Sequence, residues 1–306
     1  MLGMHGNYAS NIMTNECDVL LAVGMRFDDR VTGDLSRYAK QAKVIHVDID
    51  AAEIGKNVTP AVALHADARE ALHHIVAGVS TTHRSAWLHR MQALKSKEEI
   101  NLRKTDGPLS GITMAEVVRE LGNLTKGNAV LVTDVGQHQM IASRYYPFAS
   151  ETADNITSGG LGTMGFALPA ALGAKLARPD KSVVAIVGDG GIQMTIQELA
   201  TIAQENVPVK IIILNNNYLG MVRQWQELFF EKRYSSVEMQ NPDFVSLAKA
   251  FGIAADRTDD KTDLKSALRK LLDSEVPQLL EVLVLREENV FPMIEPGKSI
   301  SEIRLK

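Results

Sequence analysis

The 306-residue sequence has very little cysteine and no long hydrophobic run. Its one cysteine, Cys17, excludes a disulfide within the chain and a zinc site built on cysteines. The longest apolar runs are Val19–Met25, Val183–Val187 and Ile211–Leu214, whereas a membrane-spanning helix needs about 20 apolar residues. No Lys or Arg precedes the first apolar stretch, so we expect no signal peptide and a soluble, cytoplasmic protein without a membrane contact.

An excess of charge of one sign is also missing. The chain has 33 Lys and Arg residues against 37 Asp and Glu residues, which gives a formal net charge of −4. This balance indicates no nucleic-acid partner and no basic membrane-binding patch. Apolar residues make up 45% and charged residues 23%, the composition of a globular protein. The length predicts about two domains.

Short apolar runs alternate with helix-length segments in the first part of the chain. Runs rich in Val, Ile and Leu at Asp18–Val23, Lys43–Val47 and Ala61–His65 precede a helical pattern at Ala68–Ala77. This alternation is typical of parallel strands joined by crossover helices. We therefore expect residues 1–78 to belong to one α/β domain.

The alternation is stronger in the second part of the chain. After a polar, basic linker with one surface helix over residues 79–111, we expect residues 112–306 to form a doubly wound α/β domain around a parallel sheet. The expected strands are Ala129–Thr133, Ser182–Val187, Val209–Leu214 and Gln278–Val284, and the expected helices are Met114–Leu121, Gly165–Leu176, Ile196–Gln204, Pro242–Phe251 and Thr262–Asp273.

Two motifs rich in glycine and asparagine follow two of these strands. Gly188-Asp189-Gly190-Gly191 follows the strand VVAIV, and Asn215-Asn216-Asn217 follows the strand KIIIL. Open α/β sheets bind ligands at the carboxyl ends of parallel strands, where glycines and the N–H groups of the next helix suit a diphosphate. Asp189 and Asn216 offer hard oxygen ligands, so the motifs predict a Mg²⁺ site completed by a backbone carbonyl near Tyr218, two diphosphate oxygens and a water.

A simpler interpretation is that GDGG is a turn and NNN a strand end, because Gly and Asp are common in turns. The occurrence of both motifs at strand ends favours the ligand site. A nicotinamide site and a P-loop are not indicated, because no Gly-x-Gly-x-x-Gly follows a strand and no P-loop motif is present.

Longer stretches around these motifs resemble the large, catalytic subunit of acetolactate synthase (acetohydroxyacid synthase), a thiamine diphosphate (ThDP) enzyme. The stretches in the second half are DVGQHQM (134–140), SGGLGTMGFALPAA (158–171), GDGGIQMTIQELAT (188–201) and LNNNYLGMVRQWQELFFEKRYS (214–235). LGMHGNYASN (2–11), GMRFDDRVTG (24–33) and HVDIDAAEIGKN (46–57) are similar to the FAD-binding middle domain of that family. The resemblance implies a ThDP domain preceded by the second half of a parallel-sheet middle domain.

The resemblance also implies site residues. Asp189, Asn216 and the Tyr218 carbonyl would bind Mg²⁺. Residues implied for ThDP are Val135, Gly136, Gln137, His138, Gly162, Met164, Gly188, Asp189, Gly190, Gly191, Asn216, Tyr218, Leu219, Gly220 and Met221.

Two residues are implied in catalysis. Met164 would lie beneath the cofactor and brace its bent conformation, and Trp225 would form the pocket for the second 2-keto acid. From spacing alone, core packing is the favoured interpretation of both residues. The glutamate that protonates the aminopyrimidine ring in this family has no counterpart in the sequence, so we expect the isolated chain to be inactive.

The implied FAD site draws on both parts of the chain. An acidic residue at a strand end, such as Asp48, would accept ribose hydroxyl groups. The alternative for the RFDDR stretch is a surface ion-pair cluster. The residues implied for FAD are Leu2, Gly3, Met4, His5, Gly24, Arg26, Asp28, Arg30, Asp48, Asp67, Gln139 and Met140.

The reaction implied for the family is decarboxylation of pyruvate and condensation with a second 2-keto acid, in branched-chain amino acid synthesis. A homodimer or homotetramer, with a regulatory small subunit, would be the assembly. Two alternatives stay open: another ThDP-dependent carboligase or 2-keto acid decarboxylase, and a non-catalytic ThDP-binding module or split subunit.

Overall fold

The computed structural model describes residues 1–105, 111–149 and 154–305. The chain divides into two compact units: unit 1 comprises Met1–Gly107 and Phe291–Lys306, and unit 2 comprises Pro108–Val290. This division differs from the expected boundaries, because the C-terminal segment returns to unit 1 instead of completing the ThDP domain. Within the described residues, every helix is too short or too polar to span a lipid bilayer.

Unit 1 is built on a three-stranded parallel sheet in the order β1-β2-β3. Its strands are β1 (Val19–Val23), β2 (Lys43–Asp48) and β3 (Val62–His65), and its helices are α1 (Tyr8–Glu16), α2 (Asp29–Thr32), α3 (Ala68–Gly78), α4 (Ser85–Thr105) and the 3₁₀ turn η1 (Leu35–Arg37). The expected strands and the α3 helix are therefore present.

The C-terminal segment completes the core of unit 1. Its strands β10 (Met293–Ile294) and β11 (Ile303–Arg304) form an antiparallel pair. Ile294 and Ile300 are almost fully buried against Phe27 and Val44. The Ile294 N–H donates to the Met4 carbonyl at 2.8 Å, which ties the two ends of unit 1 together.

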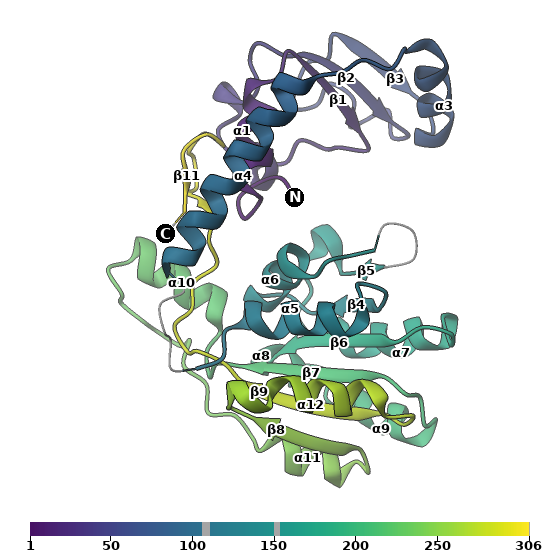
Figure 1. Cartoon of the computed structure of the whole chain (residues 1–306), viewed down its shortest axis with the longest axis vertical. Coiled ribbons are helices and arrows are strands. Elements are labelled where there is room, and N and C mark those ends of the chain that lie inside the picture. The colour runs from purple at the N-terminus through teal and green to yellow at the C-terminus, as the bar shows by residue number, and fades with distance from the viewer. Residues whose placement is uncertain (106–110, 150–153, 306) are drawn as a thin grey trace. The chain divides into compact units, whose positions relative to one another are not determined.

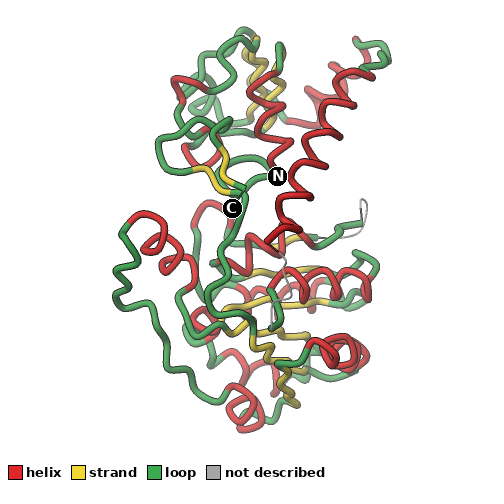
Figure 2. Tube along the Cα trace, turned by 60° about the vertical axis from the view of Figure 1, so that its left-hand side comes forward, coloured by secondary structure: helices red, strands yellow, loops and turns green. Residues whose placement is uncertain are grey.

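The expected linker helix is α4, and it packs within unit 1. Leu94 of α4 is buried against Ile12 and Met13 of α1, and Arg90 forms an ion pair with Glu16 at 2.7 Å. The long α4 ribbon is visible in both views (Figure 1, Figure 2). The polar sequence of α4 did not indicate this packing, because a single apolar stripe is enough to hold a helix against its neighbour.

Unit 2 is a doubly wound α/β domain, as expected. Its six-stranded sheet is parallel throughout, in the order β5-β4-β6-β7-β9-β8. The strands are β4 (Val130–Thr133), β5 (Asn155–Ile156), β6 (Val183–Gly188), β7 (Lys210–Asn215), β8 (Ala254–Thr258) and β9 (Gln278–Leu283). The edge strand β8 was not expected, because its sequence AADRT lacks an apolar run.

Helices cover both faces of this sheet (Figure 1, Figure 2). Alternate residues of each strand enter opposite cores, so Ile212 packs with one set of helices and Ile211 with the other. One core includes α5 (Met114–Thr125), α6 (Gln137–Tyr145) and α12 (Lys261–Asp273), and the other includes α7 (Ala167–Ala177), α9 (Glu198–Gln204) and α11 (Phe244–Ala250). The remaining elements are η2 (Gly159–Leu161), α8 (Asp189–Ile192) and α10 (Gly220–Phe229).

We predict that Ile212→Ala destabilises unit 2 by about 2–5 kcal/mol, because it leaves a cavity in a fully buried strand. Leu176→Ala is the control, because Leu176 is 65% exposed, and its expected effect stays within about 0.5 kcal/mol. Urea unfolding followed by Trp225 fluorescence, in a Trp87→Phe background, reports on unit 2 alone. Equal effects of the two substitutions would contradict the core assignment.

Candidate active site at the carboxyl edge of the unit 2 sheet

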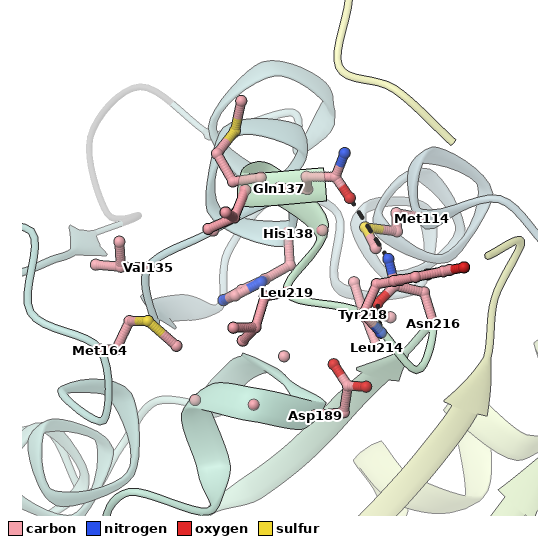
Figure 3. Close-up of a pocket in the computed structure, with 17 residues that line it drawn as sticks. Met114, Val135, Gln137, His138, Met164, Asp189, Leu214, Asn216, Tyr218 and Leu219 are labelled. Atoms are coloured by element: carbon pink, nitrogen blue, oxygen red, sulfur yellow. Dashed lines mark hydrogen bonds between the residues drawn. The ribbon is translucent and has the colours of Figure 1, made fainter. Parts of the chain in front are cut away.

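A pocket lies where β4, β6 and β7 end. Nearly all residues implied for ThDP line it, and Figure 3 shows them around one hollow. Gly162 is the one ThDP candidate that does not line the pocket. Three lining residues had not been expected: Met114, Leu214 and Val222. The full lining is Met114, Val135, Gly136, Gln137, His138, Met164, Gly188, Asp189, Gly190, Gly191, Leu214, Asn216, Tyr218, Leu219, Gly220, Met221 and Val222.

The polar residues gather at one end of this pocket. Asp189, Asn216 and Tyr218 lie together there, whereas Met164 and Val135 lie at the other end (Figure 3). Asp189 is 2% exposed, and this burial raises the pKa of its carboxyl group to about 6. The Asn216 side-chain oxygen accepts the Tyr218 N–H at 3.2 Å. The pocket thus contains one desolvated carboxylate beside one amide oxygen.

These oxygens suit a magnesium ion that is shared with phosphate groups. Mg²⁺ is usually held by one or two carboxylates together with phosphate oxygens and waters. Among the described residues, no group of three or more His, Cys, Asp or Glu side chains is placed to hold a metal by itself. Asp189 and Asn216 would supply two oxygen ligands of such an ion, and phosphate oxygens and water would have to supply the others.

Three helices begin at the pocket without a side-chain cap. The N-cap residues are Gly136 for α6, Gly188 for α8 and Leu219 for α10. By contrast, α5 is capped by the reciprocal bonds of Thr113 and Glu116. Backbone N–H groups are therefore left to face the pocket, and these groups together with the helix dipoles favour an anion.

His138 adds an unsatisfied nitrogen to the pocket. Its Nε2 atom is buried and has no hydrogen-bond partner among the described residues. Burial lowers the pKa of the imidazole to about 4, so the ring is neutral at pH 7. A ligand atom at the pocket would supply the missing partner.

Asp134 holds the loop that carries Met164. Its carboxylate is 1% exposed and accepts the N–H groups of Val135 at 2.7 Å and Gly165 at 2.9 Å. Burial raises the pKa of this carboxyl group. Because Gly165 directly follows Met164, these bonds fix the Met164 backbone beside the pocket.

Close approach explains the glycine at the start of α10. A side chain on Gly220 would place its Cβ 2.1 Å from Oε1 of Gln137 and 3.0 Å from Nδ2 of Asn216. No substituent fits between these two groups. The backbone at this position can therefore come close to a ligand.

Trp225 lies outside the pocket lining. It is partly buried on α10, and its ring contacts that of Phe229 edge to face at a centroid distance of 5.2 Å. The neighbouring Arg223 is fully buried and forms an ion pair with Glu227. These contacts orient the helix and leave the role of Trp225 in substrate selection a prediction.

The FAD candidates of unit 1 come together in part. Asp48 is the last residue of β2, whereas Gly24 and Asp67 come just after β1 and β3. The Gly24 N–H donates to the Val47 carbonyl at 2.9 Å. A second hollow is lined by Met4, Asp29, Arg30, Gly33, Ile294, Glu295, Pro296 and Gly297.

Other FAD candidates are engaged within their own unit. Arg26 forms an ion pair with Asp28 at 3.3 Å, the contact expected of a surface ion-pair cluster. His5 and Gly3 are buried, whereas Leu2 is exposed. Gln139 and Met140 belong to α6 of unit 2, where Met140 packs against the core.

Comparison with known proteins agrees with this geometry. The family described as "Thiamine pyrophosphate enzyme, C-terminal TPP binding domain" matches residues 134–282, and the "central domain" of the same enzymes matches residues 1–75. The acetolactate synthase large subunit of Cyanidium caldarium is 43% identical over 99% of this chain, which covers 52% of that protein. The acetolactate synthase isozyme 2 large subunit of Escherichia coli is 44% identical over 99% of this chain, which covers 54% of that protein.

The chain thus spans about half the length of the curated relatives it matches. The chloroplastic acetolactate synthase 1 of Nicotiana tabacum is 44% identical over 99% of the chain and 47% of its own length. Two domain families of one enzyme class, matched in their expected order, account for most of the sequence. The chain belongs to the thiamine pyrophosphate enzymes, and within them its sequence is similar to acetolactate synthase large subunits.

Proposed function

We propose that unit 2 binds Mg²⁺ and ThDP, and that the chain serves acetolactate synthesis from 2-keto acids. The observation that carries this proposal is the pocket at the ends of β4, β6 and β7, which gathers both motifs and nearly all residues implied for ThDP. The similarity to acetolactate synthase large subunits supports the choice of reaction within the ThDP enzymes.

The diphosphate and the metal would occupy the polar end of the pocket. Asp189 and the Asn216 amide oxygen would bind Mg²⁺ together with the Tyr218 carbonyl. The uncapped N-termini of α6, α8 and α10 would donate N–H groups to the diphosphate oxygens. His138, whose buried Nε2 has no hydrogen-bond partner in the described part of the chain, would contact the same anion.

When bound, ThDP supplies an electron sink for the carbon that loses carbon dioxide from a 2-keto acid. The residues of this chain position the group and exclude water. Met164, held by the Asp134–Gly165 bond, would brace the bent cofactor from the apolar end of the pocket. Trp225 would form a wide apolar wall that selects the second keto acid. Such a wall distinguishes two keto acids that differ by one methylene group by about 1–3 kcal/mol.

Partners and a second cofactor belong to the same proposal. We infer that the working protein is a homodimer or homotetramer, with a regulatory small subunit, in the cytoplasm. For FAD, Gly24, Asp48 and Asp67 at the strand ends of unit 1 provide the candidate ribose contacts, with Met4 and Arg30 lining the adjacent hollow.

A second candidate function is a ThDP-binding module without catalysis. It is a candidate because the pocket accounts for cofactor binding, whereas the chain spans only about half the length of the curated relatives it matches. Turnover of pyruvate by the chain would exclude this candidate.

Replacing the buried carboxylate should stabilise the chain without cofactor. Because the pKa of Asp189 is about 6 in the folded state and 3.8 ordinarily, ionisation favours the unfolded state. The loss of stability begins as the pH rises past about 4 and is complete above about 6. We predict that Asp189→Asn is about 1–3 kcal/mol more stable than the wild type at pH 8, by urea unfolding without metal. The gain should shrink at pH 5, and a gain equal at both pH values would contradict the assignment.

The same carboxylate should be required for the metal. We predict that Asp189→Ala abolishes the Mg²⁺-dependent affinity for ThDP in calorimetry, because no other carboxylate lines the pocket among the described residues. Asp273→Ala, at the exposed end of α12, is the control and should bind as the wild type does. Unchanged affinity of Asp189→Ala would rule out this metal site.

Product analysis tests the reaction itself. The purified chain, supplied with ThDP, Mg²⁺, FAD and pyruvate, should bind ThDP but form no acetolactate. Addition of the part of the Escherichia coli relative that this chain does not match should then yield acetolactate. Acetaldehyde as the main product would instead identify a 2-keto acid decarboxylase.

A further inference from the structure

Asn241 contacts Asp189, the predicted metal ligand, and belongs to neither of the two sequence motifs. Its side-chain Nδ2 is 2.7 Å from Oδ2 of Asp189, 3.0 Å from Oδ1 of Asn215 and 3.1 Å from Oδ1 of Asn217. One amide group therefore contacts residues that follow both β6 and β7.

Backbone pairing brings Asn241 to this position. The Leu219 N–H donates to the Val237 carbonyl at 2.8 Å, and the Met239 N–H donates to the Asn217 carbonyl at 3.0 Å. Residues 237–239 thus run antiparallel to residues 217–219, and the chain reaches Asn241 before α11 begins. The position of the amide is set by main-chain bonds.

A buried carboxylate fixes the orientation of these amides. Glu281 is 1% exposed and accepts hydrogen bonds from Asn215 Nδ2 and Arg257 Nε, both at 2.7 Å. A carboxylate paired with a guanidinium can only accept, so the oxygen of Asn215 must face Asn241. Asn241 in turn must present its NH₂ group to Asn215 and Asp189.

Gln193 confirms the same orientation from the other side. Its Nε2 donates to Oδ1 of Asn241 at 3.0 Å and to the backbone carbonyl of Asp189 at 3.0 Å. Both ends of the Asn241 amide are therefore assigned, and a flipped amide would place oxygen against oxygen on one side and N–H against N–H on the other.

We infer that Asn241 is a positioning residue for the cation site: its NH₂ group holds Oδ2 of Asp189 and so fixes the direction in which this carboxylate faces Mg²⁺. This inference rests on the proposed function. A carboxylate held at one oxygen presents the other in a fixed direction, as near-octahedral Mg²⁺ requires. Ca²⁺ accepts irregular and bidentate carboxylates, so it depends less on this restraint.

The test measures cation preference and not only affinity. With ThDP saturating, calorimetric titration of Asn241→Ala should show Mg²⁺ affinity lowered about tenfold or more, the size typical of lost support behind a metal ligand. The affinity for Ca²⁺ should fall much less, so the Mg²⁺/Ca²⁺ affinity ratio should drop. Asn123→Ala, an exposed asparagine on α5, is the matched control and should keep the wild-type ratio.

Glu281→Gln provides a second test at a distance from the cation. A glutamine can donate to Asn215 as well as accept, so the orientation of the amide chain is no longer enforced. We expect the Mg²⁺/Ca²⁺ ratio to fall in the same direction by a smaller factor. If Asn241→Ala lowers the yield of folded chain, Glu281→Gln takes its place.

The outcomes distinguish a failure of this inference from a failure of the proposed function. An unchanged Mg²⁺ affinity in Asn241→Ala, or an equal loss for both cations, overturns the positioning role while the wild type still binds Mg²⁺ and ThDP. A wild-type chain with no Mg²⁺-dependent ThDP affinity overturns the proposed function, and the positioning role with it.

Discussion

The parallel, in-register pairing of β4, β6 and β7 is the constraint on which the whole pocket depends. Thr133 pairs with Ile186 and Gly188 with Leu214, so the three segments leave the sheet at the same edge. All residues of these strands are buried, with helices on both faces. A slip of one residue would turn every side chain to the opposite core, and for this reason the packing fixes the register. Asp189 and Asn216 meet because that register brings their strand ends together.

The interior of unit 2 is closely packed and apolar, whereas the carboxyl edge of its sheet carries buried polar groups. Inside, large side chains such as Ile212 and Phe244 fill two cores around the sheet. At the edge, Asp189 is desolvated, His138 has an unbonded nitrogen within the described structure, and helices begin uncapped. Each of these features departs from the local rules of stability, and all of them lie around one pocket, as is expected of a functional site. The interior supplies the free energy that keeps these groups in position.

Much of the fold follows from the sequence because each buried strand is also an apolar run. VVAIV and KIIIL were expected as parallel strands, and the rule for open α/β sheets then predicted a ligand site at their carboxyl ends. The edge strand β8 has a polar sequence and was missed, since only one of its sides pairs with a neighbour. Asn241 carries no periodic signal, because main-chain pairing of a loop brings it to Asp189. Met114 and Val222 were not predicted either, because the apolar residues of a pocket wall form no sequence motif.

The return of Phe291–Lys306 to unit 1 bears on the order in which the protein folds. Unit 2 is continuous, so a ribosome that has released residue 290 has already supplied everything unit 2 needs. Unit 1 is interrupted, and its core lacks Ile294 and Ile300 until residues 291–306 emerge. The N-terminal part must therefore wait, incompletely packed, through the synthesis of the entire second unit. Residues 1–105 are thus synthesised before unit 2 but complete their packing after it.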